Sequence, residues 1–189
     1  KMHLHKHIPM GAGLGGGSAN AACVIKGLSQ LFDLKLSLST MESLAAELGS
    51  DTAFFVADRP ALATGRGEIL SPIELSMKGY RLVIVKPNVG VSTAEAYAHV
   101  TPHMPETVLT EQLAQPVELW KDVIGNDFEM SVFPQYPRIA QIKQQLYAMG
   151  ALYASMSGSG SAVYGIFAGD CPTVQNDFPD CFVYQEDMV

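Results

Sequence analysis

Residues 8–22 organise the sequence, and they read Ile8-Pro9-Met10-Gly11-Ala12-Gly13-Leu14-Gly15-Gly16-Gly17-Ser18-Ala19-Asn20-Ala21-Ala22. Five of the seven residues from Gly11 to Gly17 are glycines, and a helical apolar pattern follows directly. Glycine accepts positive φ angles and lets the backbone approach a ligand closely. The N-terminus of the following helix offers unpaired N–H groups and the positive end of the helix dipole. The stretch therefore predicts a turn that wraps an anionic group such as a phosphate.

Two well-known glycine-rich loops compete with this general interpretation. Gly11, Gly13 and Gly16 form a literal G-x-G-x-x-G, which alone is weak evidence for a dinucleotide site. Pro9 and the alternating pattern before it oppose that site, because its strand is normally apolar throughout. Asp33 lies about where a ribose-binding acid is expected, so the dinucleotide interpretation stays open.

A Walker A loop is opposed more firmly. That loop requires a lysine after its last glycine, whereas Gly17 is followed directly by Ser18. What remains is an anion cradle without its own lysine, in which the Ser18 hydroxyl is placed to contact a phosphate or a bound Mg²⁺. A purely structural glycine turn is the simpler alternative, at a high entropic cost for five glycines.

Composition limits the classes of function. The chain has 189 residues, 48% hydrophobic and 16% charged, which predicts a globular protein of one large or two small domains. A net charge of -7 without a basic cluster argues against nucleic acid and anionic membranes as partners. The three cysteines Cys23, Cys171 and Cys181 form no CxxC pair, so we expect ordinary thiols and a reducing, cytoplasmic location.

Periodicity predicts the order of elements. Residues 1–8 alternate like a strand, and because a strand needs neighbours, we expect that upstream sheet is missing from this chain. Helices are expected to begin near residues 14, 39, 92, 126 and 137, and the one at 39 opens with a capping box from Ser39 to Glu42 and ends at Gly49. Strands are expected over 61–64, 80–89, 162–167 and 182–184. Turns are expected at 65–67 and 157–161, and residues 101–117 are expected to form a loop with short helices.

Three further features are candidates for chemistry. Asp51 is a candidate N-cap and a candidate carboxylate that accepts a proton from a substrate hydroxyl, and the two roles are compatible. Thr93 and Tyr97 share a helix face, which suits stacking a base and bonding its edge, although a core tyrosine is the plainer interpretation. The second glycine turn, from Ser157 to Ser161, either wraps a ligand or is a simple turn. Two such turns in one chain favour a site between two lobes.

Together these motifs resemble the GHMP kinases, a family that includes galactokinase, homoserine kinase and mevalonate kinase. The segment from Pro9 to Ser18 resembles the family's second motif, and the segment from Ser157 to Ala162 its third. Marks of one branch, which acts on a cytidine-containing alcohol, follow in order over most of the chain: Lys6-x-Ile8-Pro9, Leu48-Gly49-Ser50-Asp51 with Phe54-Phe55, Gly65-Arg66-Gly67-Glu68, Lys86-Pro87 with Val91-Ser92-Thr93 and Tyr97, and Asn126-Asp127-Phe128-Glu129.

The resemblance implies a two-lobed α+β fold. Residues 1–78 would be the remainder of an N-terminal ATP-binding lobe with a left-handed βαβ crossover, incomplete here. Residues 79–189 would be a ferredoxin-like C-terminal substrate lobe. The site would lie between the lobes.

The resemblance also implies an ATP-dependent, Mg²⁺-dependent kinase of a small alcohol, with a role for each matched residue. Asp51 would be the catalytic base, Ser18 would lie near Mg²⁺, and Thr93 and Tyr97 would lie by the cytosine of the substrate. ATP would be held by Pro9, Met10, Gly11, Ala12, Gly13, Leu14, Gly15, Gly16, Gly17, Ser18 and Ala19, and the substrate would also be contacted by Ser157, Gly158, Ser159 and Gly160.

Some features depart from the family pattern. The family usually has Ala-Asp-Val-Pro where this chain has Ser50-Asp51-Thr52-Ala53. An N-terminal segment that would supply strands, a lysine beside the catalytic acid and cytidine-binding groups is absent, so we expect this chain alone to be inactive. Alternative functions are another GHMP kinase of the homoserine or mevalonate type, a non-catalytic small-molecule sensor, and a dinucleotide-binding oxidoreductase. The oligomeric state stays open, a homodimer included.

Overall fold

The structure is a computed structural model that describes residues 1–101, 107–169 and 173–189. The chain divides into two compact units, one formed by residues 15–75 and the other by residues 1–14 together with 76–189.

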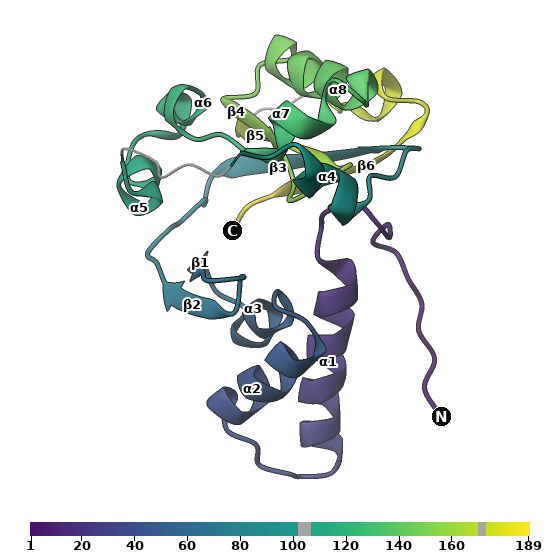
Figure 1. Ribbon diagram of the computed structural model, residues 1–189, viewed down its shortest axis with the longest axis vertical. Helices are drawn as coiled ribbons and strands as arrows, with labels where there is room; N and C mark the ends of the chain where they lie inside the picture. Colours follow the sequence, from purple (N-terminus) through teal and green to yellow (C-terminus); the bar gives the residue numbers. More distant parts are fainter. Residues whose placement is uncertain (102–106, 170–172) are drawn as a thin grey trace. The chain divides into compact units, whose positions relative to one another are not determined.

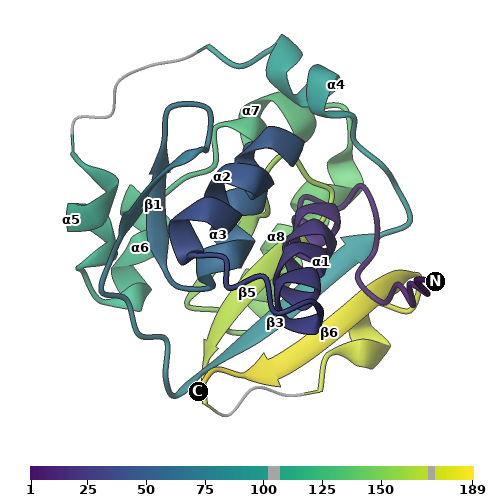
Figure 2. The ribbon, with the colours of Figure 1, turned by 90° about the horizontal axis from the view of Figure 1, so that it is seen from below.

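Three helices and a hairpin form the unit of residues 15–75 (Figure 2). The helices are α1 (Gly16–Leu31), α2 (Leu38–Leu48) and α3 (Thr52–Ala57), and the hairpin strands are β1 (Ala61–Thr64) and β2 (Ile69–Pro72). The strands pair antiparallel, and the turn between them places Gly65 and Gly67 at φ angles of 69° and 110°. These left-handed angles are those that glycine adopts without a steric penalty, which confirms the turn expected at residues 65–67.

The start of α2 corrects one expectation. Its N-cap is Ser37, whose hydroxyl accepts a hydrogen bond from the Thr40 N–H at 3.1 Å. The capping box expected at Ser39 is therefore wrong, because Ser39 is already helical. Ser37 supplies the same capping hydroxyl two residues earlier, so the helix begins after Ser37.

The other unit is built on a four-stranded antiparallel sheet. Its strands are β3 (Tyr80–Pro87), β4 (Tyr153–Met156), β5 (Val163–Ala168) and β6 (Cys181–Asp187), in the order β4-β5-β3-β6. Because β5 pairs antiparallel with both neighbours, β3 and β4 run in the same direction with β5 inserted between them. This split βαβ arrangement is ferredoxin-like, as the family resemblance implied.

Short helices connect the strands of this unit. They are α4 (Thr93–Ala98), α5 (Leu109–Leu113), α6 (Trp120–Val123), α7 (Phe128–Val132) and α8 (Pro137–Ala148), with single 3₁₀ turns at η1 (Val117–Leu119) and η2 (Gln175–Asp177). Figure 1 shows α7 and α8 over the same face of the sheet. Pro137 at the first position of α8 and Gly150 beyond its end, at φ 98°, bound this helix as the sequence predicted.

The main core of this unit lies under α8. Ile139, Ile142 and Leu146 are fully buried and pack in one cluster with residues of β3 and β5. Their spacing of three and four residues places them on one face of the helix. Burial of such aliphatic side chains is the main favourable contribution to folding.

The sequence also predicted a strand over residues 1–8 and ordinary thiols for the cysteines. Residues 1–8 form no strand, so that prediction is wrong. A strand requires ladder pairing with a neighbouring strand, which alternation of side chains does not supply. Cys23 and Cys181 are free thiols, whereas Cys171 lies outside the described residues.

The described helices and strands can be compared with a membrane span and with the expected left-handed crossover. None of the helices in the described part of the chain is both long and apolar enough to span a bilayer. A left-handed βαβ crossover needs parallel strands, and the described residues 15–75 pair only in the antiparallel β1–β2 hairpin. The crossover therefore stays an expectation.

The core under α8 predicts a difference between neighbouring positions. Replacing Ile142 by Ala removes buried methylene groups and leaves a cavity, so the free energy of unfolding should fall by about 2–5 kcal/mol. Gln141→Ala, at an exposed position of the same helix, should change it by less than about 0.5 kcal/mol. Urea unfolding followed by circular dichroism measures both, and equal losses would contradict this account of the core.

Candidate active site

The first glycine turn has the backbone conformation that its sequence predicted. Gly11, Gly13 and Gly15 have φ angles of 60°, 73° and 62°. Gly15 is the N-cap residue of α1, and no side chain caps this helix end. The first N–H groups of α1 therefore lack a side-chain acceptor from the cap position, and the positive end of the helix dipole favours an anion there.

The two glycine turns touch within the unit of residues 1–14 and 76–189. The Ser157 hydroxyl donates to the Gly13 carbonyl oxygen at 2.7 Å, and the Ala162 N–H donates to the Ala12 carbonyl oxygen at 3.0 Å. A Cβ atom on Gly13 would lie only 1.9 Å from the Ser157 carbonyl oxygen. Glycine at position 13 is therefore required both by its φ angle and by the backbone of the second turn.

The second turn joins β4 to β5. The Ser157 N–H donates to the Ala162 carbonyl and the Gly160 N–H to the Ser157 carbonyl, at 2.8 and 2.9 Å. Gly158 and Gly160 take φ angles of 52° and 90°. Within the described residues, the N–H groups of Gly158 and Ser159 make no hydrogen bond. Successive free N–H groups in a turn of this kind are typical of anion sites.

Helix α4 presents the two residues expected near a base. Ser92 and Glu95 form a capping box at its start. Tyr97 is 63% exposed, so the interpretation as a core tyrosine is wrong, and its ring meets the Phe128 ring edge-on at 4.8 Å between centroids. Thr93, one turn earlier, is also exposed. An exposed, supported aromatic ring next to a hydroxyl can stack on a base and bond its edge.

The capping box fixes the charge of Glu95. The Ser92 N–H, the Ser92 hydroxyl and the Tyr136 hydroxyl all hydrogen-bond with this residue and lower the pKa of its carboxyl group. A lowered folded-state pKa stabilises the fold at pH values above the unfolded pKa. This contribution is lost as the pH falls through the lower folded-state pKa.

Asp51 lies at the N-terminus of α3 without capping it. No hydrogen bond joins its side chain to the helix N–H groups, and the residue is exposed. Its carboxylate lies against the turn of the β1–β2 hairpin, where a Cβ atom on Gly67 would be 3.0 Å from Asp51 Oδ1. Asp51 therefore occupies the N-cap position of α3, as one interpretation expected, while its carboxylate makes no bond to the helix.

The predicted site residues are distributed over both units. Asp51 and residues 15–19 belong to the unit of residues 15–75, whereas residues 9–14, Thr93, Tyr97 and the second glycine turn belong to the other. Ser18 is half-buried in the first turn of α1. No group of three or more His, Cys, Asp or Glu residues suited to a metal ion occurs among the described residues.

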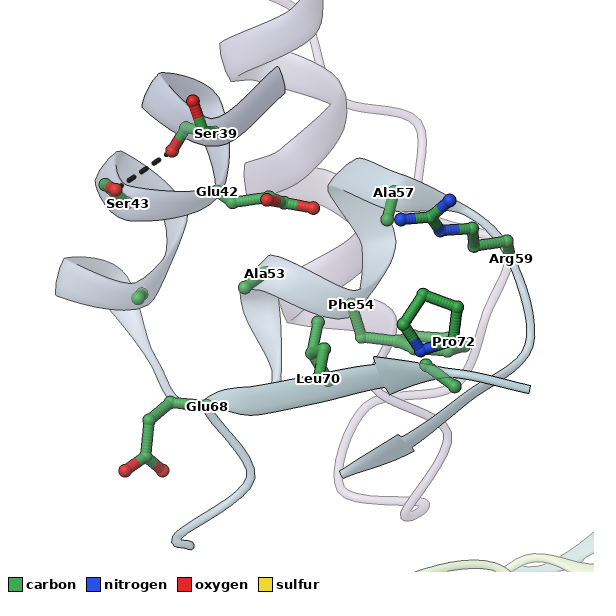
Figure 3. A pocket seen from close by; sticks show the side chains of 12 residues that line it. Ser39, Glu42, Ser43, Ala53, Phe54, Ala57, Arg59, Glu68, Leu70 and Pro72 are labelled. Carbon is green, nitrogen blue, oxygen red and sulfur yellow. Dashed lines mark hydrogen bonds between the residues drawn. The ribbon is translucent and has the colours of Figure 1, made fainter. Parts of the chain in front are cut away.

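Cavities in the described part of the chain adjoin these elements. One of 590 Å³ is lined by Pro9 and Leu14 of the first glycine turn, with Ile84, Phe182 and Tyr184 among the residues of β3 and β6. A second, of 420 Å³, lies between α2, α3 and the β1–β2 hairpin. Figure 3 shows Glu42 of α2 and Arg59, from the segment between α3 and β1, at this cavity together with Leu70 of the hairpin. None of the predicted site residues lines the second cavity, and no sequence motif pointed to it.

Comparison with known proteins identifies the family. Residues 1–59 match the GHMP kinase N-terminal domain, and residues 110–180 match the GHMP kinase C-terminal domain. A relative from Bacteroides fragilis named 4-diphosphocytidyl-2-C-methyl-D-erythritol kinase is 50% identical over 187 residues, which cover 99% of this chain and 68% of the relative. The chain belongs to the GHMP kinases.

Further relatives agree with this membership. A 4-diphosphocytidyl-2-C-methyl-D-erythritol kinase from Bacteroides thetaiotaomicron is 53% identical over 178 residues, covering 94% of this chain and 65% of the relative. A crystal structure of 4-(cytidine 5'-diphospho)-2C-methyl-D-erythritol kinase matches with a TM-score of 0.73 at 30% identity, covering 96% of this chain and 68% of the other. The fold and family expected from the motifs are thus confirmed for this GHMP kinase.

The contact between the glycine turns predicts the effect of one methyl group. Gly13→Ala forces a Cβ atom into the backbone of Ser157 and strains the left-handed φ angle, which alone costs roughly 1–2 kcal/mol. The melting temperature should fall by about 5 °C or more.

Gly27→Ala is the matched control for this substitution. A Cβ atom on Gly27, within α1, would have no other atom within 4 Å. Because alanine is the better helix former, the melting temperature of this variant should stay the same or rise by about a few degrees. Differential scanning calorimetry decides, and a Gly13→Ala variant as stable as the parent would contradict the close approach of the two turns.

Proposed function

We propose that this GHMP kinase transfers the γ-phosphoryl group of ATP to the 2-hydroxyl of 4-diphosphocytidyl-2-C-methyl-D-erythritol, a step of non-mevalonate isoprenoid precursor synthesis. The observation that carries the proposal is the 50% identity over 187 residues to a relative with the corresponding name. The glycine turn ahead of an uncapped helix supports it, because that turn offers an anion site of the kind that ATP phosphates need.

The nucleotide is assigned to the first glycine turn. Residues from Pro9 to Ala19 hold the phosphates through backbone N–H groups and the N-terminus of α1, which explains how an acidic protein without a Walker lysine binds an anion. Ser18, in the first helical turn, is the residue proposed to contact Mg²⁺. A bound Mg²⁺ would neutralise charge on the phosphates during transfer.

Asp51 is assigned the role of general base. Its carboxylate is exposed and is not used as a helix cap, so it can accept the proton of the substrate hydroxyl that attacks the γ-phosphorus. In phosphoryl transfer most of the rate enhancement comes from positioning and electrostatics, and the base directs the attacking oxygen. Residues 1–78 are accordingly assigned to the nucleotide-binding lobe.

The substrate is assigned to elements of residues 79–189. Tyr97, exposed and supported edge-on by Phe128, stacks on the cytosine, and Thr93 bonds the edge of that ring. The turn from Ser157 to Gly160 closes on the substrate, where the N–H groups of Gly158 and Ser159 suit its diphosphate oxygens. The closed turn also reaches Gly13 of the nucleotide loop.

Asp51 provides the test of the catalytic assignment. In the full-length protein, Asp51→Asn keeps the size of the side chain but removes the base, so kcat should fall by roughly 10²–10⁴-fold. ATP affinity, measured by isothermal titration calorimetry, should change by less than about threefold. Asp58→Asn is the control, because Asp58 lies at the opposite end of α3, at a φ of 51° that asparagine tolerates.

Other outcomes would redirect the assignment. Equal loss of turnover and ATP binding in Asp51→Asn would indicate a structural residue. Phosphorylation of homoserine or mevalonate in place of the cytidine alcohol would keep the family and replace the substrate. ATP binding without turnover on any of these alcohols would point to a sensor, and tight binding of NADH in a fluorescence titration would point to the dinucleotide interpretation.

A further inference from the structure

The second glycine turn is held by two side chains from the start of α7. Asn126 Nδ2 donates to the carbonyl oxygens of Met156 and Gly158, at 2.7 and 2.8 Å. Glu129 Oε1 accepts from the Met156 N–H at 2.8 Å and from the Ser155 hydroxyl at 3.2 Å. Asn126 and Glu129 thus bracket the end of β4 and the first residues of the turn. None of the roles assigned above uses either side chain.

The orientation of the Asn126 amide is fixed by its partners. Its Oδ1 accepts from the Phe128 N–H at 2.9 Å, while its Nδ2 faces two carbonyl oxygens. A flipped amide would bring an oxygen against two carbonyls and an NH₂ group against an N–H group. Both N–H donors of the Asn126 amide therefore go to carbonyls at the second turn, while its oxygen accepts from the start of α7.

Glu129 is held in place from the other side. Its Oε2 pairs with Lys143 Nζ of α8 at 2.5 Å, and the two side chains are only 12% and 21% exposed. A half-buried charged pair keeps its geometry when hydrogen bonds satisfy the remaining lone pairs, which Met156 and Ser155 do here. The rigid helix α8 thus fixes a carboxylate that in turn fixes the end of β4.

We infer that Asn126 and Glu129 are positioning residues for phosphoryl transfer: they hold the Ser157–Gly160 turn in the conformation that receives the substrate. The bracket engages the carbonyls of Met156 and Gly158, and the N–H groups of Gly158 and Ser159 in the same turn make no hydrogen bond within the described residues. The inference rests on the proposed function, which assigns this turn to the substrate. It adds a reason for the spacing Asn-x-x-Glu, whose asparagine lies 30 residues before Met156 at the end of β4.

Asn126→Asp in the full-length protein separates this role from a merely structural one. The aspartate retains the acceptor for the Phe128 N–H, loses both donors, and sets a negative charge against two carbonyls. The KM for the cytidine alcohol should rise about tenfold or more while kcat falls by less than about threefold. Amide resonances of Gly158 and Ser159 should shift in the ¹⁵N–¹H correlation spectrum.

Asp127→Asn is the matched control, because Asp127 is the exposed neighbour in the same motif and caps nothing with its side chain. This variant should leave KM and the turn resonances unchanged. Two variants test Glu129: Glu129→Gln keeps one acceptor for the Met156 N–H but loses the ion pair with Lys143, so it should raise KM less than Glu129→Ala, which removes both and should raise KM about tenfold.

The outcomes separate the inference from the function on which it rests. Unshifted Gly158 and Ser159 resonances in a folded Asn126→Asp protein would overturn the bracket. Shifted resonances with an unchanged KM would overturn the role of the turn in substrate binding, and with it the inference, while phosphoryl transfer by the parent protein would still stand. If Asn126→Asp fails to fold, the Glu129→Gln and Glu129→Ala pair decides on the same two measurements.

Discussion

The backbone contact between Gly13 and Ser157 is the constraint on which the candidate site depends. A Cβ atom at position 13 would lie 1.9 Å from a carbonyl oxygen, so the two turns can meet only where one of them has no side chain. The Ser157 hydroxyl then closes the contact with a hydrogen bond to the Gly13 carbonyl. A loop proposed for the nucleotide and a loop proposed for the substrate are thereby fixed against each other across 144 residues of sequence.

The ferredoxin-like sheet makes that contact rigid. The second turn connects β4 and β5, which are buried under α8, and its base is bracketed by Asn126 and Glu129. A turn that is already held in one conformation loses less conformational entropy when it binds a ligand. Glycines supply the left-handed φ angles at the tip of the turn. Asn126, just before α7, and Glu129 of α7, which is paired with Lys143 of α8, hold its base. The turn therefore has glycines at its tip and hydrogen-bonded side chains that fix its base.

Much of this arrangement could be predicted from local sequence. The helix start near residue 137 and the glycine turns could be predicted, because each is governed by backbone preference within a few residues. The errors have the same local origin. Ser37 competes with Ser39 as a cap, and the choice between two serines depends on where the helix packs. Residues 1–8 have the alternation of a strand, yet alternation alone cannot provide the hydrogen-bonding partner that a strand requires.

By itself, the sequence determined the family, the order of the elements and the positions where only glycine fits a left-handed turn, because these depend on residue type and spacing along the chain. Only the tertiary structure decided which polar groups meet. It showed Tyr97 exposed against Phe128, Asp51 free of any capping bond, and the Asn126 amide joined to two carbonyls that are 30 and 32 residues away. The reason is physical: a hydrogen bond acts over about 3 Å, and folding alone brings such distant residues within that range.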